Sequence, residues 1–314
     1  MMQSKLPQCD SSQCARRDSR YREIMNTLFD IVRVSGPDVR AFLQGQLTQD
    51  VAKLADVPSL PAAWCNPKGR VITIMRMIEA GSDEIALSMP AALVEPVAKR
   101  LLMFRFRARV DIMPADGEWG AFAVSDDEDI AALEALGLLP TAAGGSAARN
   151  AGLVAIDTGA PIRCVEVFGP LSAMEEAGLA ISRPLPDAEW QLALINAGMP
   201  VIDPATTEKY TPHMLNLDCL DAISFTKGCY TGQEVVARTQ HLGKIKRRLM
   251  HFRTPEPAAG TGDKLRYEER DAGEVLNAAG EHLLAVVPLE LRGRTLLAKG
   301  RPAIPVDLPY ALPE

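Results

Sequence analysis

The sequence predicts an α+β fold followed by a smaller all-β part. Short segments with the alternation of strands are mixed irregularly with amphipathic helical segments, and none has the long apolar run of a buried parallel strand. Past Gly243 the pattern changes to short apolar runs separated by Gly and Pro, which is typical of antiparallel strands joined by turns. The length of 314 residues, about twice that of an ordinary domain, agrees with two such parts.

Three segments are expected along the chain. Residues 1–24 are polar and lack apolar periodicity, so we predict a disordered extension, and translation starts either at Met1 or nearer Met25. Residues 25–243 are predicted to form the α+β core and residues 244–314 the all-β domain. No apolar run approaches the roughly 18 residues that span a bilayer, so we expect no membrane segment.

The first predicted elements are a strand and a helix. Residues 28–34 alternate and contain β-branched side chains, which favours a strand. Ser35 is the predicted N-cap of the next helix, with Asp38 three positions later. The apolar face of this helix is predicted to consist of Val39, Phe42 and Leu43.

A hairpin and a second helix are expected next. Residues 60–65 and 70–78 are predicted strands, and the sequence Asn66-Pro-Lys-Gly69 between them suits a tight turn. Residues 91–103 are predicted to be helical. Residues 104–112 return to a period of two, which predicts another strand.

Further along, a capping box at Ser125-Asp-Asp-Glu128 predicts a helix that ends at Gly137. Residues 141–150 are small and polar, which is typical of a loop between two lobes. Residues 187–197 are predicted to form a helix that ends at Gly198.

The segment with the most chemical content runs from Ala222 to Arg238. Thr231 and Glu234 have the spacing of a capping box and predict the start of a helix. Cys229 lies just before this helix and two residues after Lys227, where a positive field favours the thiolate. Cys229 is therefore a candidate reactive residue. The alternative stays open that Cys229 is a small buried hydrophobe and that Lys227 is solvated.

Composition excludes several classes of protein. Lys and Arg number 34 against 40 Asp and Glu, so the net charge is −6 and no global positive field attracts nucleic acid. The six cysteines contain no C-x-x-C pair, which suits a reducing cytosol and argues against a zinc or disulfide framework. The four histidines show no metal-ligand spacing, so no metal site is expected.

A family resemblance rests on the octapeptide Lys227-Gly-Cys-Tyr-Thr-Gly-Gln-Glu234 with Arg238. These residues resemble the signature of the YgfZ-type folate-binding proteins, which are relatives of the glycine-cleavage T protein, an aminomethyltransferase. Further segments resemble the family in the same order along the chain, namely Phe42–Asp50, Pro67–Arg70, Trp190–Asp203 and Leu308–Tyr310.

The resemblance implies a T-protein-like core of two intertwined ferredoxin-like lobes around a central hole, followed by a small antiparallel β-barrel. It implies tetrahydrofolate or a derivative as the cofactor. It also implies a cytoplasmic role in the assembly or repair of iron–sulfur enzymes, including tRNA-modifying ones, with those enzymes or cluster-assembly proteins as partners. A tetrahydrofolate-dependent aminomethyl transferase and a non-catalytic adaptor are the alternatives, and whether the protein is an enzyme stays open.

The same resemblance assigns site residues. Trp190 is expected to form an aromatic wall for folate, although an ordinary core position is the alternative, and Phe29 corresponds to a second aromatic of the family. Asn196 stands where tightly binding relatives carry a Glu that pairs with the pterin, which predicts weaker affinity here. Cys229 and Lys227 are the candidate catalytic residues. The other expected folate contacts are Tyr230, Gln233, Glu234 and Arg238.

The sequence departs from the aminomethyltransferase pattern at one turn, and it contains a group of basic residues. The turn Asn66–Gly69 stands where the true aminomethyltransferase has a G-G-I-x-D element, so glycine-cleavage activity is the weaker interpretation. Direct contact with tRNA is also disfavoured, because a solvated strand edge explains the basic residues better than an RNA site does. These residues are Arg105, Arg107, Arg109, Lys244, Lys246, Arg247 and Arg248.

Overall fold

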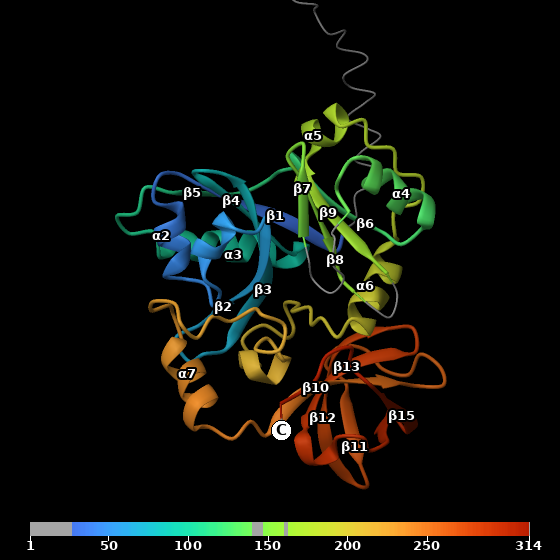
Figure 1. Ribbon diagram of the computed structural model, residues 1–314. Coiled ribbons are helices and arrows are strands. Elements are labelled where there is room, and N and C mark those ends of the chain that lie inside the picture. Colours follow the sequence, from blue (N-terminus) through green and yellow to red (C-terminus); the bar gives the residue numbers. More distant parts are fainter. Residues whose placement is uncertain (1–26, 140–146, 160–162, 314) are drawn as a thin grey trace, which may run out of the picture.

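The computed structural model describes residues 27–139, 147–159 and 163–313, so the predicted extension over residues 1–24 lies outside the described residues. The described chain forms two antiparallel sheets and a closed barrel (Figure 1). The predicted α+β class with a C-terminal antiparallel barrel is confirmed. Within the described ranges, no helix has both the length and the apolar character that a bilayer crossing requires.

The first sheet has the strand order β2-β3-β4-β1-β5. Its strands are β1 (Phe29–Ser35), β2 (Ser59–Cys65), β3 (Val71–Gly81), β4 (Glu84–Pro90) and β5 (Asp111–Pro114). Helices α2 (Val39–Gln44) and α3 (Ala91–Met103) bury their apolar sides in one core with these strands. The predicted face of Val39, Phe42 and Leu43 is indeed buried there. A short 3-10 helix, η1 (Val51–Ala55), follows α2.

The second sheet has the order β6-β9-β8-β7. Its strands are β6 (Trp119–Val124), β7 (Ala147–Asn150), β8 (Leu153–Asp157) and β9 (Val165–Pro170). Helices α4 (Asp127–Ala135) and α5 (Leu171–Glu176) share a core with one face of this sheet, whereas α6 (Asp187–Asn196) shares a core with the other. The α6 core also contains Ile31 and Ile78 of the first sheet, so it joins the two sheets.

The barrel closes in the order β10-β13-β12-β11-β14-β15. Its strands are β10 (Arg247–Arg253), β11 (Lys264–Tyr267), β12 (Arg270–Ala279), β13 (His282–Pro288), β14 (Leu296–Ala298) and β15 (Arg301–Val306), with the 3-10 helix η3 (Leu289–Leu291) between β13 and β14. The 3-10 helix η2 (Pro212–Leu215) and helix α7 (Gln233–Leu242) precede the barrel. Figure 1 shows the barrel below the second sheet and α7 below the first sheet.

Two predictions near the first helix are wrong. Ser35 is the last residue of β1 and does not cap α2, which begins at Val39 after Asp38. The Asp38 carboxylate instead accepts hydrogen bonds from the backbone amide and the guanidinium of Arg109. The predicted strand over residues 104–112 begins only at Asp111, because the chain turns before it, with the amide of Ala108 donating to the carbonyl of Arg105.

The second sheet brings two further corrections. Asp126, one residue after the predicted Ser125, caps α4 by accepting a hydrogen bond from the amide of Glu128 at 2.9 Å. Ala147–Asn150 forms strand β7, where a loop was predicted, and the rest of that predicted loop lies outside the described residues. The predicted ends of α4 and α6 are confirmed, since Gly137 and Gly198 adopt positive φ angles of 64° and 68°.

Candidate functional site

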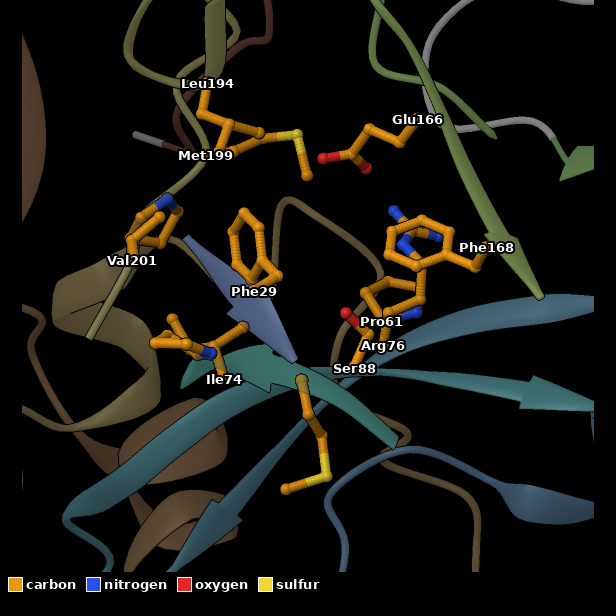
Figure 2. Close-up of a pocket in the computed structure, with 13 residues that line it drawn as sticks. Phe29, Pro61, Ile74, Arg76, Ser88, Glu166, Phe168, Leu194, Met199 and Val201 are labelled. Carbon is orange, nitrogen blue, oxygen red and sulfur yellow. The ribbon is translucent and has the colours of Figure 1, made fainter. Parts of the chain in front are cut away.

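A cavity lies where the first sheet, strand β9 and the end of α6 meet (Figure 2). We call it the inner cavity. It is narrow, with a volume of about 70 Å³, which by itself is below the range of about 300–1,000 Å³ typical of small-molecule sites. The side chains that give it its chemical character are Phe29, Arg76, Ser88, Glu166, Phe168 and Met199. Its walls are thus mainly apolar, with two charged groups among them.

A wider cleft continues from the inner cavity. We call it the outer cleft, and it shares Pro61, Ile74, Arg76, Met199 and Pro200 with the inner cavity. It has a volume of about 560 Å³, within the range typical of small-molecule sites, and it opens to solvent. The two spaces together suit an elongated ligand with a ring at one end.

The C-terminal segment forms one side of the outer cleft. Tyr310 lines the cleft, and its hydroxyl donates a hydrogen bond to the carbonyl oxygen of Gly198 at 2.8 Å. The Nδ2 atom of Asn216 donates to the same hydroxyl at 3.2 Å. A Cβ atom on Gly198 would lie 2.7 Å from the Tyr310 ring, so only glycine permits this close contact. The end of α6 and the C-terminal segment are therefore fixed to each other.

Arg76 is the buried cation of the inner cavity. It lies on β3 with only 9% of its surface exposed, and its Nη1 atom is buried without a hydrogen-bond partner among the described residues. Burial lowers the pKa of the guanidinium, and the charge of Glu166 opposes that shift. An unpartnered charged donor in such a place is costly unless a ligand pairs with it.

Glu166 on β9 is the buried carboxylate of the same cavity. Its Oε1 atom accepts a hydrogen bond from Nε1 of Trp190 at 2.8 Å. Burial raises the pKa of Glu166, whereas the charge of Arg76 and the Trp190 hydrogen bond lower it. Figure 2 shows the Glu166 and Arg76 side chains directed toward the space beside Phe29.

Trp190 lies behind the cavity wall. Its side chain is fully buried and is not among the residues that line the inner cavity or the outer cleft. Its ring centroid is 5.2 Å from that of Phe29, which does line the inner cavity. Phe29 therefore lines this cavity, whereas Trp190 packs behind Phe29 and holds Glu166 by a hydrogen bond. A wall function of Trp190 for folate stays a prediction.

Asn196, expected to contact the pterin, is turned toward its own helix. Its Nδ2 atom donates to the carbonyl of Leu192 at 3.0 Å, and the residue lines neither space. Glu166, which the sequence reasoning missed together with Arg76 and Phe168, is the carboxylate at the cavity. The signal was present, since Glu166 is the single charge of its strand and Arg76 lies between apolar neighbours in a mainly apolar strand.

Lys227 of the signature segment is buried and holds the backbone after α2. Its ammonium donates hydrogen bonds to the carbonyl oxygens of Gln44, Leu47 and Gln49 at 2.8, 2.7 and 2.9 Å. It also lies 5.3 Å from the ring centroid of Tyr230. Burial lowers the pKa of Lys227 to about 8. The solvated lysine considered from the sequence is therefore wrong.

Cys229 is exposed, so the alternative of a small buried hydrophobe is also wrong. Among the other described cysteines, Cys65 and Cys164 are buried and Cys219 is partly buried. Burial raises the pKa of Cys65 to about 12 and that of Cys219 to about 11. Cys229 is thus the described thiol that a partner molecule reaches most easily.

The helix after Cys229 begins differently from the prediction. Gly232, with a φ of +85°, precedes the first residue Gln233, and Thr231 does not cap the helix. A Cβ atom on Gly232 would lie 2.5 Å from the carbonyl oxygen of Asn66. The glycine is therefore required by contact with the turn between β2 and β3.

The predicted site residues fall into two groups. Phe29 lines the inner cavity, and Trp190 packs behind it. The signature residues Lys227, Cys229, Tyr230, Gln233, Glu234 and Arg238 line neither the inner cavity nor the outer cleft. Tyr230 is buried, whereas Glu234 and Arg238 are exposed on α7. Their part in folate binding stays a prediction.

Two further expectations concern charge and metal. Arg248, placed in the basic cluster from the sequence, is 1% exposed and forms a two-pronged ion pair with Asp218 at 2.5 and 2.8 Å. It is therefore not available on the surface. Across the described residues, no group of three or more His, Cys, Asp or Glu side chains is arranged to hold a metal ion.

The chain is similar to known proteins in sequence and in fold. No family model matches the chain. The tRNA-modifying protein YgfZ of Colwellia psychrerythraea is 32% identical over 262 residues, which cover 81% of this chain and 78% of the relative. The protein of the same name from Pectobacterium carotovorum is 33% identical over 256 residues, covering 78% of this chain and 75% of the relative. The glycine cleavage system aminomethyltransferase T of Bartonella henselae superposes with a TM-score of 0.65 at 15% identity, over 92% of this chain and 88% of its own, which shows a shared fold.

Proposed function

Because the chain belongs to the YgfZ family, we propose that it is a cytosolic tetrahydrofolate-binding accessory protein that supports the assembly or repair of iron–sulfur enzymes, including tRNA-modifying ones. Its relatives are named tRNA-modifying proteins, which supports the link to tRNA modification. The fold shared with aminomethyltransferase T supports the choice of a folate as ligand.

The observation that carries the proposal is the pair of buried charges in the inner cavity. A reduced pterin is a flat ring that needs apolar walls and hydrogen-bonding groups at one edge. Phe29 and Phe168 are apolar walls of the cavity. Glu166 can accept hydrogen bonds from ring N–H groups, and Nη1 of Arg76, which has no partner among the described residues, can donate to a ring acceptor. The residues present therefore fit the ring, and the outer cleft has room for the remainder of the molecule.

Tetrahydrofolate, when bound, supplies a carrier for one-carbon units. The chain itself contributes binding and orientation: the walls exclude water from the ring, and Trp190 fixes the Glu166 carboxylate by its hydrogen bond. Cys229 lies exposed on the signature loop, where its thiol is able to meet a client protein. We propose that Cys229 acts transiently as a thiolate in sulfur, iron or one-carbon chemistry.

Binding is tested by titrating tetrahydrofolate while tryptophan fluorescence is recorded. We expect saturable quenching, because Trp190 packs against the wall residue Phe29. Glu166→Gln should weaken binding by about 10-fold, since the neutral amide accepts less strongly from ring N–H groups. Glu134→Gln, on the exposed side of α4 and outside both spaces, is the matched control and should bind as the unchanged protein does. Absence of saturable binding to the unchanged protein would refute a folate function.

The accessory role is tested by complementation. In a deletion strain, Cys229→Ala and Cys229→Ser should fail to restore iron–sulfur enzyme activity while keeping the melting temperature, because the side chain is exposed. Ser172→Ala, at an exposed position on α5 that lines neither the inner cavity nor the outer cleft, is the control and should complement. Complementation by both Cys229 variants would refute the assigned role. Formation of methylenetetrahydrofolate from an aminomethyl donor would favour a transferase instead.

A further inference from the structure

We infer that Arg76 selects the ligand of the inner cavity by a ring carbonyl, so that the site takes 2-amino-4-oxo pterins and discriminates against their 4-amino counterparts. The inference rests on the proposed function and names the residue that reads one particular edge of the ring. It concerns Arg76 because neither the signature segment nor the family resemblance assigned this residue a role.

The Arg76 guanidinium is a buried charged donor. Nine-tenths of the residue is buried, and Nη1 has no hydrogen-bond partner among the described residues. The side chain lines the inner cavity and also the outer cleft, so it stands where the two spaces join. A buried charged donor that faces a cavity is stabilised when the ligand in that cavity supplies a hydrogen-bond acceptor.

The ligand group that Arg76 binds is expected to be a neutral acceptor rather than an anion. Glu166 faces the same cavity, and its charge already acts on Arg76. An anionic ring substituent bound by Arg76 would lie close to the Glu166 carboxylate and be repelled by it. A neutral carbonyl avoids this repulsion, and N–H groups on the adjacent ring edge satisfy the carboxylate.

Arg76 and Glu166 together present a pattern of one donor and one acceptor group to the ligand. Oε1 of Glu166 is occupied by the indole N–H of Trp190, which leaves Oε2 for ring donors. Arg76 donates and Glu166 accepts, so together they match a ring edge that presents a carbonyl beside N–H groups. The 2-amino-4-oxo pyrimidine part of a pterin has that edge. A 4-amino ring places a donor where Arg76 also donates.

The test compares two ligands on the unchanged protein and on Arg76→Met, with dissociation constants measured by fluorescence quenching. The ligands are tetrahydrofolate and its 4-amino analogue, which differ at position 4 and also at N3, because the 4-amino ring lacks the N3 hydrogen that faces Glu166. The unchanged protein should prefer the 4-oxo form by at least about 10- to 100-fold, the value of one hydrogen bond to a charged donor. In Arg76→Met the preference should fall by about 10-fold or more, mainly through weaker binding of the 4-oxo form, and only the part that rests on N3–H and Glu166 should remain.

Arg40→Met is the matched control, because Arg40 pairs with Glu79 away from the cavity, and it should keep the full preference. Equal affinity of the unchanged protein for both ligands would overturn the inference without any variant being needed. So would an undiminished preference in folded Arg76→Met.

Arg76 also lines the outer cleft, so the rival partner is the carboxylate tail of the ligand. A tetrahydropterin without the tail separates the two. If Arg76→Met weakens both folates equally and leaves the tail-less ring unaffected, Arg76 binds the tail and the inference is wrong. Absence of tetrahydrofolate binding to the unchanged protein would instead overturn the proposed function, and this inference with it.

Discussion

Replacing Lys227 by Met should destabilise the protein strongly, because this side chain holds three backbone carbonyls. Its ammonium reaches Gln44, Leu47 and Gln49 within 2.9 Å, in a buried position. Methionine preserves the apolar stem and removes all three hydrogen bonds. Each carbonyl left unpaired costs about 1–3 kcal/mol, and relief from burying the charge offsets part of the sum. We therefore expect the free energy of unfolding to fall by about 3–5 kcal/mol.

The assay is urea denaturation followed by tryptophan fluorescence, since Trp64 lies in the same core as the held segment. Lys68→Met, on the exposed turn between β2 and β3, is the control and should change the free energy of unfolding by less than about 0.5 kcal/mol. Lys227→Arg should also destabilise, because a planar guanidinium does not match three converging carbonyls. An unchanged unfolding midpoint for Lys227→Met would refute the structural role and leave the lysine free to act on Cys229.

Two other predictions concern stability. Gly232→Ala should lower the free energy of unfolding by about 2–4 kcal/mol, because alanine disfavours the positive φ and its Cβ would lie 2.5 Å from a carbonyl oxygen. Gly228→Ala, with nothing within 4 Å of the added Cβ, is the control and should leave this free energy nearly unchanged. Equal effects of the two substitutions in chemical denaturation would contradict the prediction. Burial lowers the pKa of His251 to about 4, below its unfolded value of about 6.5, so the unfolded chain binds the proton first and stability falls as the pH drops from 6.5 toward 4. The His251 contribution to this loss should reach about 2 kcal/mol at pH 5 in denaturation curves. Burial also lowers the pKa of His213 and His282, so His251→Gln should make the loss smaller without abolishing it, while exposed His241→Gln keeps it. An unchanged slope in His251→Gln would refute the assignment.

Much of the fold was predictable because periodicity reports burial locally. The strands and helices around Val39, Trp190 and the turn at Asn66 follow from apolar spacing and from glycine or proline positions. The caps were less predictable, since they depend on distant partners. Asp38 is engaged by Arg109, which is 71 residues away, so the local pattern that favoured Ser35 as the cap had no access to the deciding contact.

The candidate site was predictable only in part, for the same reason. Phe29 and Trp190 were identified through the resemblance, and the structure brings their rings together. Arg76 and Glu166 belong to strands of different sheets, and the sequence alone does not show that two isolated charges face one cavity. Conversely, the signature around Cys229 is contiguous in sequence and easily noticed, yet its residues lie away from that cavity.

The hydrogen bond between Tyr310 and Gly198 sets the order in which the ligand site can form during synthesis. The two residues are 112 positions apart, and Phe29 on the opposite side comes from the first strand. A nascent chain that has emerged only as far as α6 already contains Arg76 and Glu166, but the outer cleft still lacks the side that Tyr310 supplies. The outer cleft is therefore complete only after the barrel and the C-terminal segment have been synthesised, and a ligand of this cleft can be enclosed only late in synthesis.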